Sequence, residues 1–518
     1  MSSTVARAAA IALTGLEGTP VLVEAALSNQ LPGMAIIGLP DPAIAEAKQR
    51  VRLAIQRAGV TTQSRFVVVN LSPAALPKQG SGFDLAIALS IAAAAGQAPE
   101  AGMPVTAHLG ELGLDGGLRR PPGLLGAVLA ARGLGFERVM VPDSCAREAA
   151  LVPGIEVIAV RDLAGALAWY RGDADGWRVG ASDDDPSDTA ERPEGADRSD
   201  MAEVIGQPEA VEAMVVAAAG RHHLSMVGPP GAGKTLLATR LPTILPDLDE
   251  DEQIVASSIA SLGGNPLTEL VTRPPFESPH HTASSVSIIG GGAGGAVRPG
   301  AITRACHGVL FLDETPQFPS AVLDGLRQPL ESGTVEIHRA KVRALLPARV
   351  QLILAANPCP CGNAGSPETA AECRCTPLMR TRYLGRVSGP LVDRIDLRLS
   401  VRRISSALPA LAEEPRPTSA QLRRRVVEAR ARAADRLRGT PWCVNAEVPG
   451  SWLRGPGARP SRAETAVLDQ ALARGALTMR GYDRALRLGW TLADLAGNER
   501  PGRGELAQAL ALRGGATL

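Results

Sequence analysis

The sequence predicts a three-part protein of the α/β class, with a doubly wound parallel sheet in its middle part and a helical last part. Three observations support this prediction. A glycine-rich loop follows a short apolar run at 223–227 and precedes a helical pattern at 235–241. Two further apolar runs, at 308–312 and 349–356, end in polar residues, as strands do at the ligand-binding edge of such a sheet. Beyond about residue 418 the pattern is mostly helical.

The glycine-rich loop fits the phosphate-binding pattern at every fixed position. Glycines let successive backbone N–H groups turn toward phosphate oxygens, lysine adds a positive charge, and threonine offers a hydroxyl ligand to Mg²⁺. The helix that follows would direct its positive N-terminus at the phosphates. We therefore expect a nucleoside triphosphate and Mg²⁺ to bind at this loop. Its residues are Gly228, Pro229, Pro230, Gly231, Ala232, Gly233, Lys234 and Thr235.

Two apolar runs that end in polar residues supply the groups that this loop lacks. Asp313 and Glu314 follow the first run, and Asn357 follows the second. We expect Asp313 to hold Mg²⁺ together with Thr235, Glu314 to polarise the attacking water, and Asn357 to orient that water. An asparagine before proline is also a common turn, so Asn357 has a second interpretation.

Length and composition set limits on the class of protein. The 518 residues suggest about three domains, at roughly 150 residues each. The net charge of +1 excludes a globally basic nucleic-acid binder but permits a local basic channel. No apolar run approaches the roughly 20 residues of a membrane span, and the first residues lack a signal-peptide pattern. We expect a cytoplasmic protein without membrane association.

An acidic stretch divides the chain. Residues 181–200 hold eight acidic residues and no large apolar side chain, so they cannot bury enough surface to fold. We therefore expect an α+β unit at 1–178, a flexible linker at 179–200, the phosphate-loop unit at 201–403 and a helical unit at 404–518.

Four of the seven cysteines cluster in a CxC…CxC pair. Four soft ligands in one loop suit tetrahedral Zn²⁺ in a structural site. The alternative is a set of reduced, unliganded cysteines or a redox pair. The cysteines are Cys359, Cys361, Cys373 and Cys375.

Two basic segments are candidates for contact with DNA. The first is a glycine-rich insertion at 280–304 that contains Arg298. The second alternates like a β-hairpin at 334–343, and its alternation predicts Arg339, Lys341 and Arg343 on one face. Such a row suits a phosphate backbone, with little sequence dependence. The alternative is a solvated strand edge. Seven arginines at 423–438 predict a solvated or intersubunit helix face, with direct DNA contact as the alternative.

The residues that carry this chemistry resemble an AAA+ ATPase. The segment 385–397 resembles the arginine-finger segment of the magnesium-chelatase and MCM branch, and 477–484 resembles its second sensor helix. This likeness implies that Arg394 reaches the γ-phosphate of a neighbouring subunit. It gives Arg480, or failing that Arg484, the sensor role. It also implies a homo-oligomer, a hexameric ring.

Over nearly its whole length, the chain resembles the ComM/YifB family of magnesium-chelatase-like proteins. The matching segments include 31–40, 70–78, 300–308 and 386–394. The resemblance implies an ATP-driven helicase that promotes DNA branch migration when incoming DNA recombines. It also implies a helical lid at the C-terminal end of the chain. The alternatives are a magnesium-chelatase motor subunit and a protein-remodelling ATPase.

The N-terminal unit resembles the Lon-protease/S5-like α+β fold, but it departs from the protease pattern. The expected nucleophile position falls on Gly82, with Ser81 one residue early, and arginines at 119 and 120 stand where the family has a lysine. Arginine does not release its proton, so it cannot act as the base. We therefore do not expect protease activity.

Overall fold

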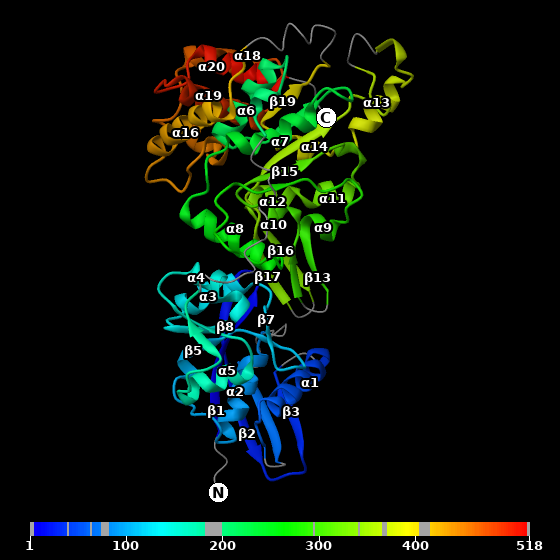
Figure 1. The fold of residues 1–518 in the computed structure, drawn as a ribbon. Helices are drawn as coiled ribbons and strands as arrows, with labels where there is room; N and C mark the ends of the chain where they lie inside the picture. Colours follow the sequence, from blue (N-terminus) through cyan, green and yellow to red (C-terminus); the bar gives the residue numbers. More distant parts are fainter. Residues whose placement is uncertain are drawn as a thin grey trace.

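The computed structural model describes residues 5–38, 41–62, 65–73, 82–181, 199–293, 296–339, 342–364, 370–403 and 415–514. Figure 1 shows the chain as a sequence of parts, with the N-terminal unit at one end, the phosphate-loop unit in the middle and the last helices at the other end. No helix of these residues is long and apolar enough to cross a membrane. Most of the predicted linker, 182–198, lies outside the described residues.

The N-terminal unit is built on one mixed sheet of eight strands, in the order β10-β9-β8-β5-β1-β2-β4-β3. Its central helix α2 (Asp84–Ala94) is mostly apolar and is buried from Asp84 to Ala92. It packs against the sheet and against two other helices, α1 (Asp41–Arg57) and α5 (Leu163–Arg171). The strands are β1 (Ala6–Thr14), β2 (Glu17–Ser28), β3 (Gly33–Ile37), β4 (Phe66–Ser72), β5 (Thr106–His108), β8 (Arg138–Pro142), β9 (Glu156–Val160) and β10 (Trp177–Val179).

The middle unit is a five-stranded sheet in the order β12-β15-β18-β11-β19, and every pair of neighbours is parallel. Its three central strands are buried throughout, which explains their unbroken apolar sequences. The prediction of a parallel α/β core is confirmed. The strands are β11 (Leu224–Val227), β12 (Phe276–Glu277), β15 (Val309–Leu312), β18 (Gln351–Ala356) and β19 (Leu397–Ser400).

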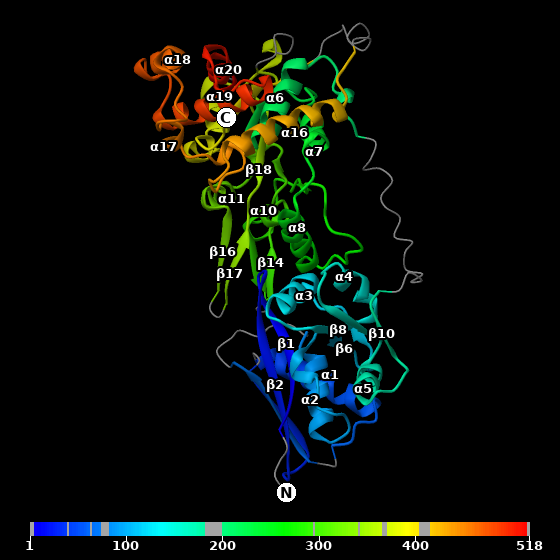
Figure 2. The same ribbon diagram turned by 90° about the vertical axis from the view of Figure 1, so that its left-hand side faces the viewer.

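Two hairpins project from the middle unit toward the N-terminal unit, beside helix α8 (Glu250–Leu262) (Figure 2). They are β13 (Gly290–Ala293) with β14 (Ala296–Pro299), and β16 (Thr334–Arg339) with β17 (Val342–Pro347). The second hairpin meets the N-terminal unit at the β1–β2 turn. A Cβ atom built on Gly15 would lie 3.1 Å from the Leu345 carbonyl oxygen.

The N-terminal unit also docks on the middle unit through helix α3 (Leu124–Gly133), which packs against α8. Arg120 connects the two sides. Its guanidinium donates to both carboxylate oxygens of Glu148 at 2.8 and 2.9 Å, and to the backbone oxygens of Ser261 and Asn265. Arg120, which stands where the protease family has its lysine, therefore contacts both the N-terminal unit and the middle unit.

The last residues form the predicted helical region, packed on helix α6 (Pro208–Gly220) of the middle unit. Of the arginines at 423–438, predicted to form a solvated or intersubunit face, two contact this same chain instead of solvent. Arg430 donates to the Ala218 carbonyl oxygen, and Arg436 lies against Asp494 and the Trp490 ring. The helices are α16 (Ser419–Arg436), α17 (Gly450–Leu453), α18 (Arg462–Ala473), α19 (Met479–Ala496) and α20 (Arg503–Arg513).

Candidate nucleotide-binding site

The phosphate-loop motif lies between the carboxyl end of β11 and the start of α7 (Lys234–Ile244). Gly231 and Gly233 have φ angles of +75° and +86°, which side chains rarely adopt. A Cβ atom on Gly228 would lie 2.2 Å from the Val401 carbonyl oxygen, so this position has no room for a side chain. The glycines are therefore required by the loop conformation, which leaves the N-terminus of α7 at a cavity where anions are favoured.

The ammonium group of Lys234 is buried inside the loop. Nζ donates to the carbonyl oxygens of Gly228 and Pro229 at 2.6 and 3.0 Å, and to Oδ1 of Asn357 at 3.0 Å. These three acceptors match its three donors. Burial lowers the pKa of the Lys234 ammonium, while the charges of Asp313 and Glu314 act in the opposite direction.

The predicted magnesium ligands lie side by side. Thr235 Oγ1 donates to Oδ2 of Asp313 at 2.8 Å, and the other carboxylate oxygen of Asp313 accepts from the Glu314 backbone N–H at 2.8 Å. A hydroxyl and a carboxylate, both hard oxygen donors, fit Mg²⁺. These two side chains would hold the ion.

Glu314 lines the same cavity. Its backbone has φ +49° and ψ +41°, a left-handed conformation that is rare for residues with a side chain. Its carboxylate, which is 43% exposed, lies with Oε2 3.4 Å from Nδ1 of His281. The cavity has a volume of about 580 Å³ and is lined by residues 230–236 and 278–281 together with Asp313, Glu314 and Asn357.

Sequence reasoning missed the histidines of this cavity. His280 and His281 begin the glycine-rich insertion, directly beyond the short edge strand β12. The signal that could have identified them in the sequence was a pair of adjacent titratable residues just after a strand of the same sheet. Their approach to Glu314 depends on β12 lying beside β15, with Glu277 opposite Leu310, and this pairing is not visible in the sequence.

The predicted finger and sensor arginines gather at a different cavity, of about 170 Å³, which shares no lining residue with the phosphate cavity. Arg394 is 11% exposed, ion-pairs with Glu331 and donates to the Pro390 carbonyl oxygen. Burial lowers the pKa of Arg394 and the charge of Glu331 opposes the change. Arg480 also lines this cavity.

Arg484 and Arg480 differ in their surroundings. Arg484 Nη1 lies 2.5 Å from Oδ1 of Asp396, a carboxylate that is 2% exposed. Burial disfavours the charge of Asp396, but Arg484 and the neighbouring histidines hold the pKa of this carboxyl well below its usual range. Arg480 is exposed and forms no hydrogen bond or ion pair with any residue in the described part of the chain. Arg480 therefore stays the first choice for the sensor.

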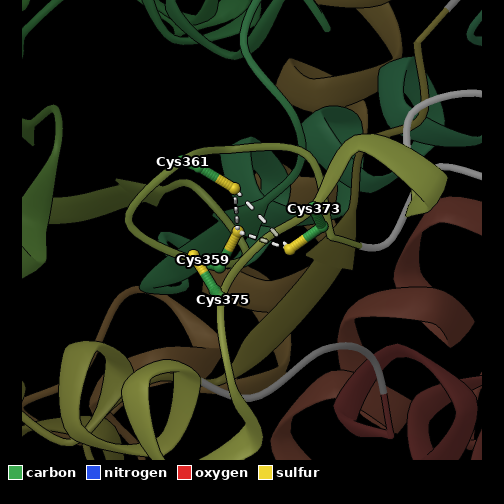
Figure 3. Close-up of side chains that lie close together, drawn as sticks. All are labelled: Cys359, Cys361, Cys373 and Cys375. Carbon is green, nitrogen blue, oxygen red and sulfur yellow. Dashed lines mark hydrogen bonds between the residues drawn. The ribbon is translucent and has the colours of Figure 1, made fainter.

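The four predicted zinc ligands come together (Figure 3). Three sulfur–sulfur distances, among Cys359, Cys361 and Cys373, are 3.4, 3.6 and 3.7 Å, and all four sulfurs lie within 4.8 Å of one another. A tetrahedron with Zn–S bonds of about 2.3 Å has edges of about 3.8 Å, so the donor set fits zinc. A hydrogen bond from the Asn363 backbone lowers the pKa of Cys361 to about 6, which favours the thiolate that binds metal.

The predicted basic row on the second hairpin stays a prediction. Lys341 lies outside the described residues, as does the side chain of Arg339. In the backbone ladder Arg339 pairs with Val342, and Arg343 pairs with His338. Arg298, opposite Gly291, is exposed on the first hairpin.

Three magnesium-chelatase families match successive stretches of the chain. Residues 23–145 match the family described as "Subunit ChlI of Mg-chelatase". Residues 200–408 match "Magnesium chelatase, subunit ChlI", and residues 416–513 match "Magnesium chelatase, subunit ChlI C-terminal". The phosphate loop, both predicted magnesium ligands and Arg394 all lie in the second of these stretches.

Similar proteins extend the likeness over almost the whole chain. The Mycobacterium tuberculosis protein Rv2897c is 44% identical over 510 residues, 98% of each chain. The competence protein ComM of Haemophilus influenzae is 36% identical over 500 residues, 96% of this chain and 95% of ComM. YifB of Escherichia coli is 34% identical over 507 residues, 97% of this chain and 96% of YifB. With its parallel core and its phosphate loop, the chain belongs to the ComM/YifB family of magnesium-chelatase-like AAA+ ATPases.

Proposed function

We propose that the chain is a Mg²⁺-dependent ATPase motor that acts on DNA as a hexameric ring. The observation that supports it best is the single cavity around which Lys234, Thr235, Asp313, Glu314 and Asn357 converge. Lys234 binds the phosphates, and Thr235 and Asp313 hold the metal ion. When bound, Mg²⁺ supplies positive charge at the phosphate oxygens.

Hydrolysis needs a water molecule, a base and stabilisation of the developing charge. Glu314 accepts a proton from the water as its oxygen bonds to the γ-phosphorus, and the bond to the bridging oxygen of ADP breaks. Asn357 orients this water. The side chains of Asn357 and Lys234 are already hydrogen-bonded at 3.0 Å. With nucleotide bound, we therefore expect both side chains to lie at the same phosphate.

The arginines support an oligomer. Arg394 and Arg480 line a cavity that has no residue in common with the phosphate cavity of the same chain. We therefore assign both to the site of a neighbouring subunit, where Arg394 stabilises the charge of the transferred phosphoryl group. Head-to-tail interfaces form a ring when the rotation between subunits closes, and a closed ring gives every subunit such a neighbour.

Two observations favour DNA as the substrate. The similar protein ComM is described as a competence protein, and it covers 96% of this chain. The exposed arginines Arg298 and Arg343 lie on the two projecting hairpins, where phosphate contacts would be independent of sequence. We propose branch migration of recombining DNA as the activity that hydrolysis drives.

A magnesium-chelatase motor is the second candidate, and the descriptions of all three matched families favour it. It predicts stimulation by a porphyrin-binding partner, and none by DNA. We also propose one structural Zn²⁺ on the four cysteines, where it would hold together the loop that follows Asn357.

The decisive experiment measures ATP turnover alone and with single-stranded, duplex and four-way-junction DNA, at several salt concentrations. We expect stimulation by branched or single-stranded DNA that falls steeply with salt. Glu314→Gln is the matched control and should bind ATP without turning it over. A chain that hydrolyses ATP but neither binds nor responds to any DNA at low salt would contradict the DNA part of the proposal and leave the ATPase part standing.

A further inference from the structure

The four clustered cysteines differ in their access to solvent. Cys359 and Cys375 are buried, with exposures of 0% and 7%, whereas Cys373 is half-buried and Cys361 is exposed. Burial protects a sulfur from small oxidants in solution, and exposure leaves it open to them. Cys361 is therefore the member of the cluster that an oxidant reaches first.

A second sulfur lies within reach of Cys361. The Sγ atoms of Cys361 and Cys373 are 3.6 Å apart (Figure 3). Arg380, on helix α13 (Pro377–Leu384), donates from Nη2 to Cys373 Sγ at 3.3 Å and so helps to fix this sulfur near Cys361. The two sulfurs of a disulfide are about 2.05 Å apart, so a small approach of the two side chains would join them.

The other close sulfur is a poorer partner for Cys361. Cys359 Sγ lies 3.4 Å from Cys361 Sγ, but one residue separates the two in sequence, and a disulfide across so short a loop departs from the ordinary geometry of such bonds. The buried Cys359 sulfur also accepts from the Ala364 backbone N–H at 3.4 Å. Cys361 and Cys373 are thus the pair best placed to be joined.

Cys361 is also next in sequence to a contact with the phosphate loop. Gly362 has φ +82°, and a Cβ atom built on it would lie 2.6 Å from the ring of Pro230. The Gly362 N–H donates to the Cys359 carbonyl oxygen at 3.0 Å, which closes a turn that contains Cys361. Movement of the Cys361 side chain toward another sulfur would therefore shift the residue that lies against Pro230.

We propose that Cys361 and Cys373 form an oxidation site, at which a hydroperoxide such as hydrogen peroxide joins the two sulfurs in a disulfide and thereby weakens ATP binding. The inference rests on the proposed function, because it takes the four cysteines as the zinc site and residues 228–235 as the ATP site. It adds a modification that connects the two sites.

The oxidation needs no reactant besides the peroxide. The Cys361 thiolate attacks one oxygen of hydrogen peroxide, the O–O bond breaks and hydroxide leaves, so the sulfur becomes a sulfenic acid. The Cys373 thiolate then attacks this sulfur, the S–S bond forms and the sulfenic oxygen leaves as a second hydroxide. The two sulfurs lose two electrons and the peroxide gains them. Two thiolates remain in the cluster, too few for a four-coordinate structural site, so zinc is released.

The test treats reduced full-length protein with hydrogen peroxide. It maps disulfides by mass spectrometry of peptides, measures released zinc with a colorimetric chelator and determines the Kd for ATP. Every protein carries Cys443→Ser, because Cys443 is exposed too and would compete for peroxide. We expect a disulfide between Cys361 and Cys373, release of about one zinc per chain and a higher Kd for ATP. Reductant and zinc added together should reverse all three changes.

Cys361→His is the matched variant. Imidazole can replace one thiolate in a Cys₃His zinc site, and it has no sulfur to oxidise. This variant should therefore keep both its zinc and its affinity for ATP in peroxide. The reversal by reductant and zinc in protein with Cys361 intact makes the same comparison without a substitution in the cluster.

The outcomes separate this inference from the proposed function. If peroxide joins a different pair of cysteines or none, the inference is wrong, and the ATPase and zinc proposals stand. A disulfide between Cys361 and Cys373 that leaves the Kd for ATP unchanged would overturn the connection to the phosphate loop. If reduced protein holds no zinc but this disulfide forms and weakens ATP binding, the zinc proposal is wrong and the oxidation site stands.

Discussion

The ammonium of Lys234 donates a hydrogen bond to the amide oxygen of Asn357, with 3.0 Å between Nζ and Oδ1. Lys234 follows β11 and Asn357 follows β18, and these strands are parallel neighbours in register from Leu224 to Val227. The carboxyl ends of adjacent parallel strands meet at one edge, so two motifs far apart in sequence become one site. The side chain that would bind phosphate and the one that would orient water are thus already in contact.

Replacing Asn357 with alanine should separate binding from chemistry. Lys234 keeps its two carbonyl partners in the loop, so ATP affinity should change little. The attacking water loses its orientation, and kcat should fall by about 100-fold, as when one preorganised polar group is removed from a reaction site. Steady-state kinetics and nucleotide-binding titrations check both values. A variant with unchanged kcat would remove Asn357 from the mechanism.

Arg394 should act on the site of a neighbouring subunit. Arg394→Ala alone and Glu314→Gln alone should each turn over ATP at least 100-fold more slowly than wild type. When the two variants are co-assembled in equal amounts, about a quarter of the head-to-tail interfaces should regain an intact pair, and activity should return in proportion. ATPase activity across mixing ratios measures this effect. Mixed assemblies as inactive as the separate variants would contradict action between subunits.

Much of this site was predictable because its signals are local. The loop from Gly228 to Thr235 carries its own pattern, and Asp313, Glu314 and Asn357 each follow a buried apolar strand. The four cysteines lie within one loop, so their approach required no long-range packing. The parallel core followed from the same apolar runs.

Features that depend on tertiary contacts were not predictable in this way. The arginines of α16 were expected to face solvent or a neighbouring subunit. Arg430 instead donates to the Ala218 carbonyl oxygen, on a helix more than two hundred residues earlier in the same chain. His281 meets Glu314 only through the pairing of an edge strand two residues long.

The stability of the N-terminal unit should fall in mild acid because of His108. This side chain is fully buried between the Ala9 carbonyl oxygen and the Tyr170 hydroxyl, and burial lowers its pKa from 6.5 to about 4, although the Ala9 bond opposes the change. Between these values the unfolded chain binds a proton that the folded chain does not, so the free energy of unfolding decreases as pH falls. The loss from pH 7 to pH 5 should be about 2 kcal/mol.

Hydrogen exchange at the amides of β1 and β5 measures this pH dependence where His108 packs. His108→Gln has no group that titrates in this range and is the matched variant. The difference in free energy of unfolding between wild type and variant should change by that amount from pH 7 to pH 5. If this free-energy difference stays constant from pH 7 to pH 5, His108 is not the source of the pH dependence.

Arg120→Ala should loosen the N-terminal unit from the middle unit. The substitution leaves the Glu148 carboxylate, which is 3% exposed, without its guanidinium partner, and an uncompensated buried charge costs about 3–5 kcal/mol. The Ser261 hydroxyl would still donate to Glu148, at 2.7 Å. Faster hydrogen exchange in both α3 and α8 is the expected result. Arg120→Lys keeps the charge without the forked geometry and should give an intermediate effect.

Removal of zinc should weaken ATP binding, because the cysteine loop rests on the phosphate loop. A Cβ atom on Gly362, which has φ +82°, would lie 2.6 Å from the ring of Pro230. Chelation under reducing conditions frees the loop that carries this contact, so the phosphate loop loses its support and the Kd for ATP should rise. Metal analysis should find one zinc per chain before chelation and none after it, and re-addition of zinc should restore affinity.

Gly362→Ala provides the complementary change, since it should keep the zinc while disturbing Pro230 and weakening ATP binding. Unchanged ATP affinity in both the zinc-free protein and Gly362→Ala would show that the two loops are independent.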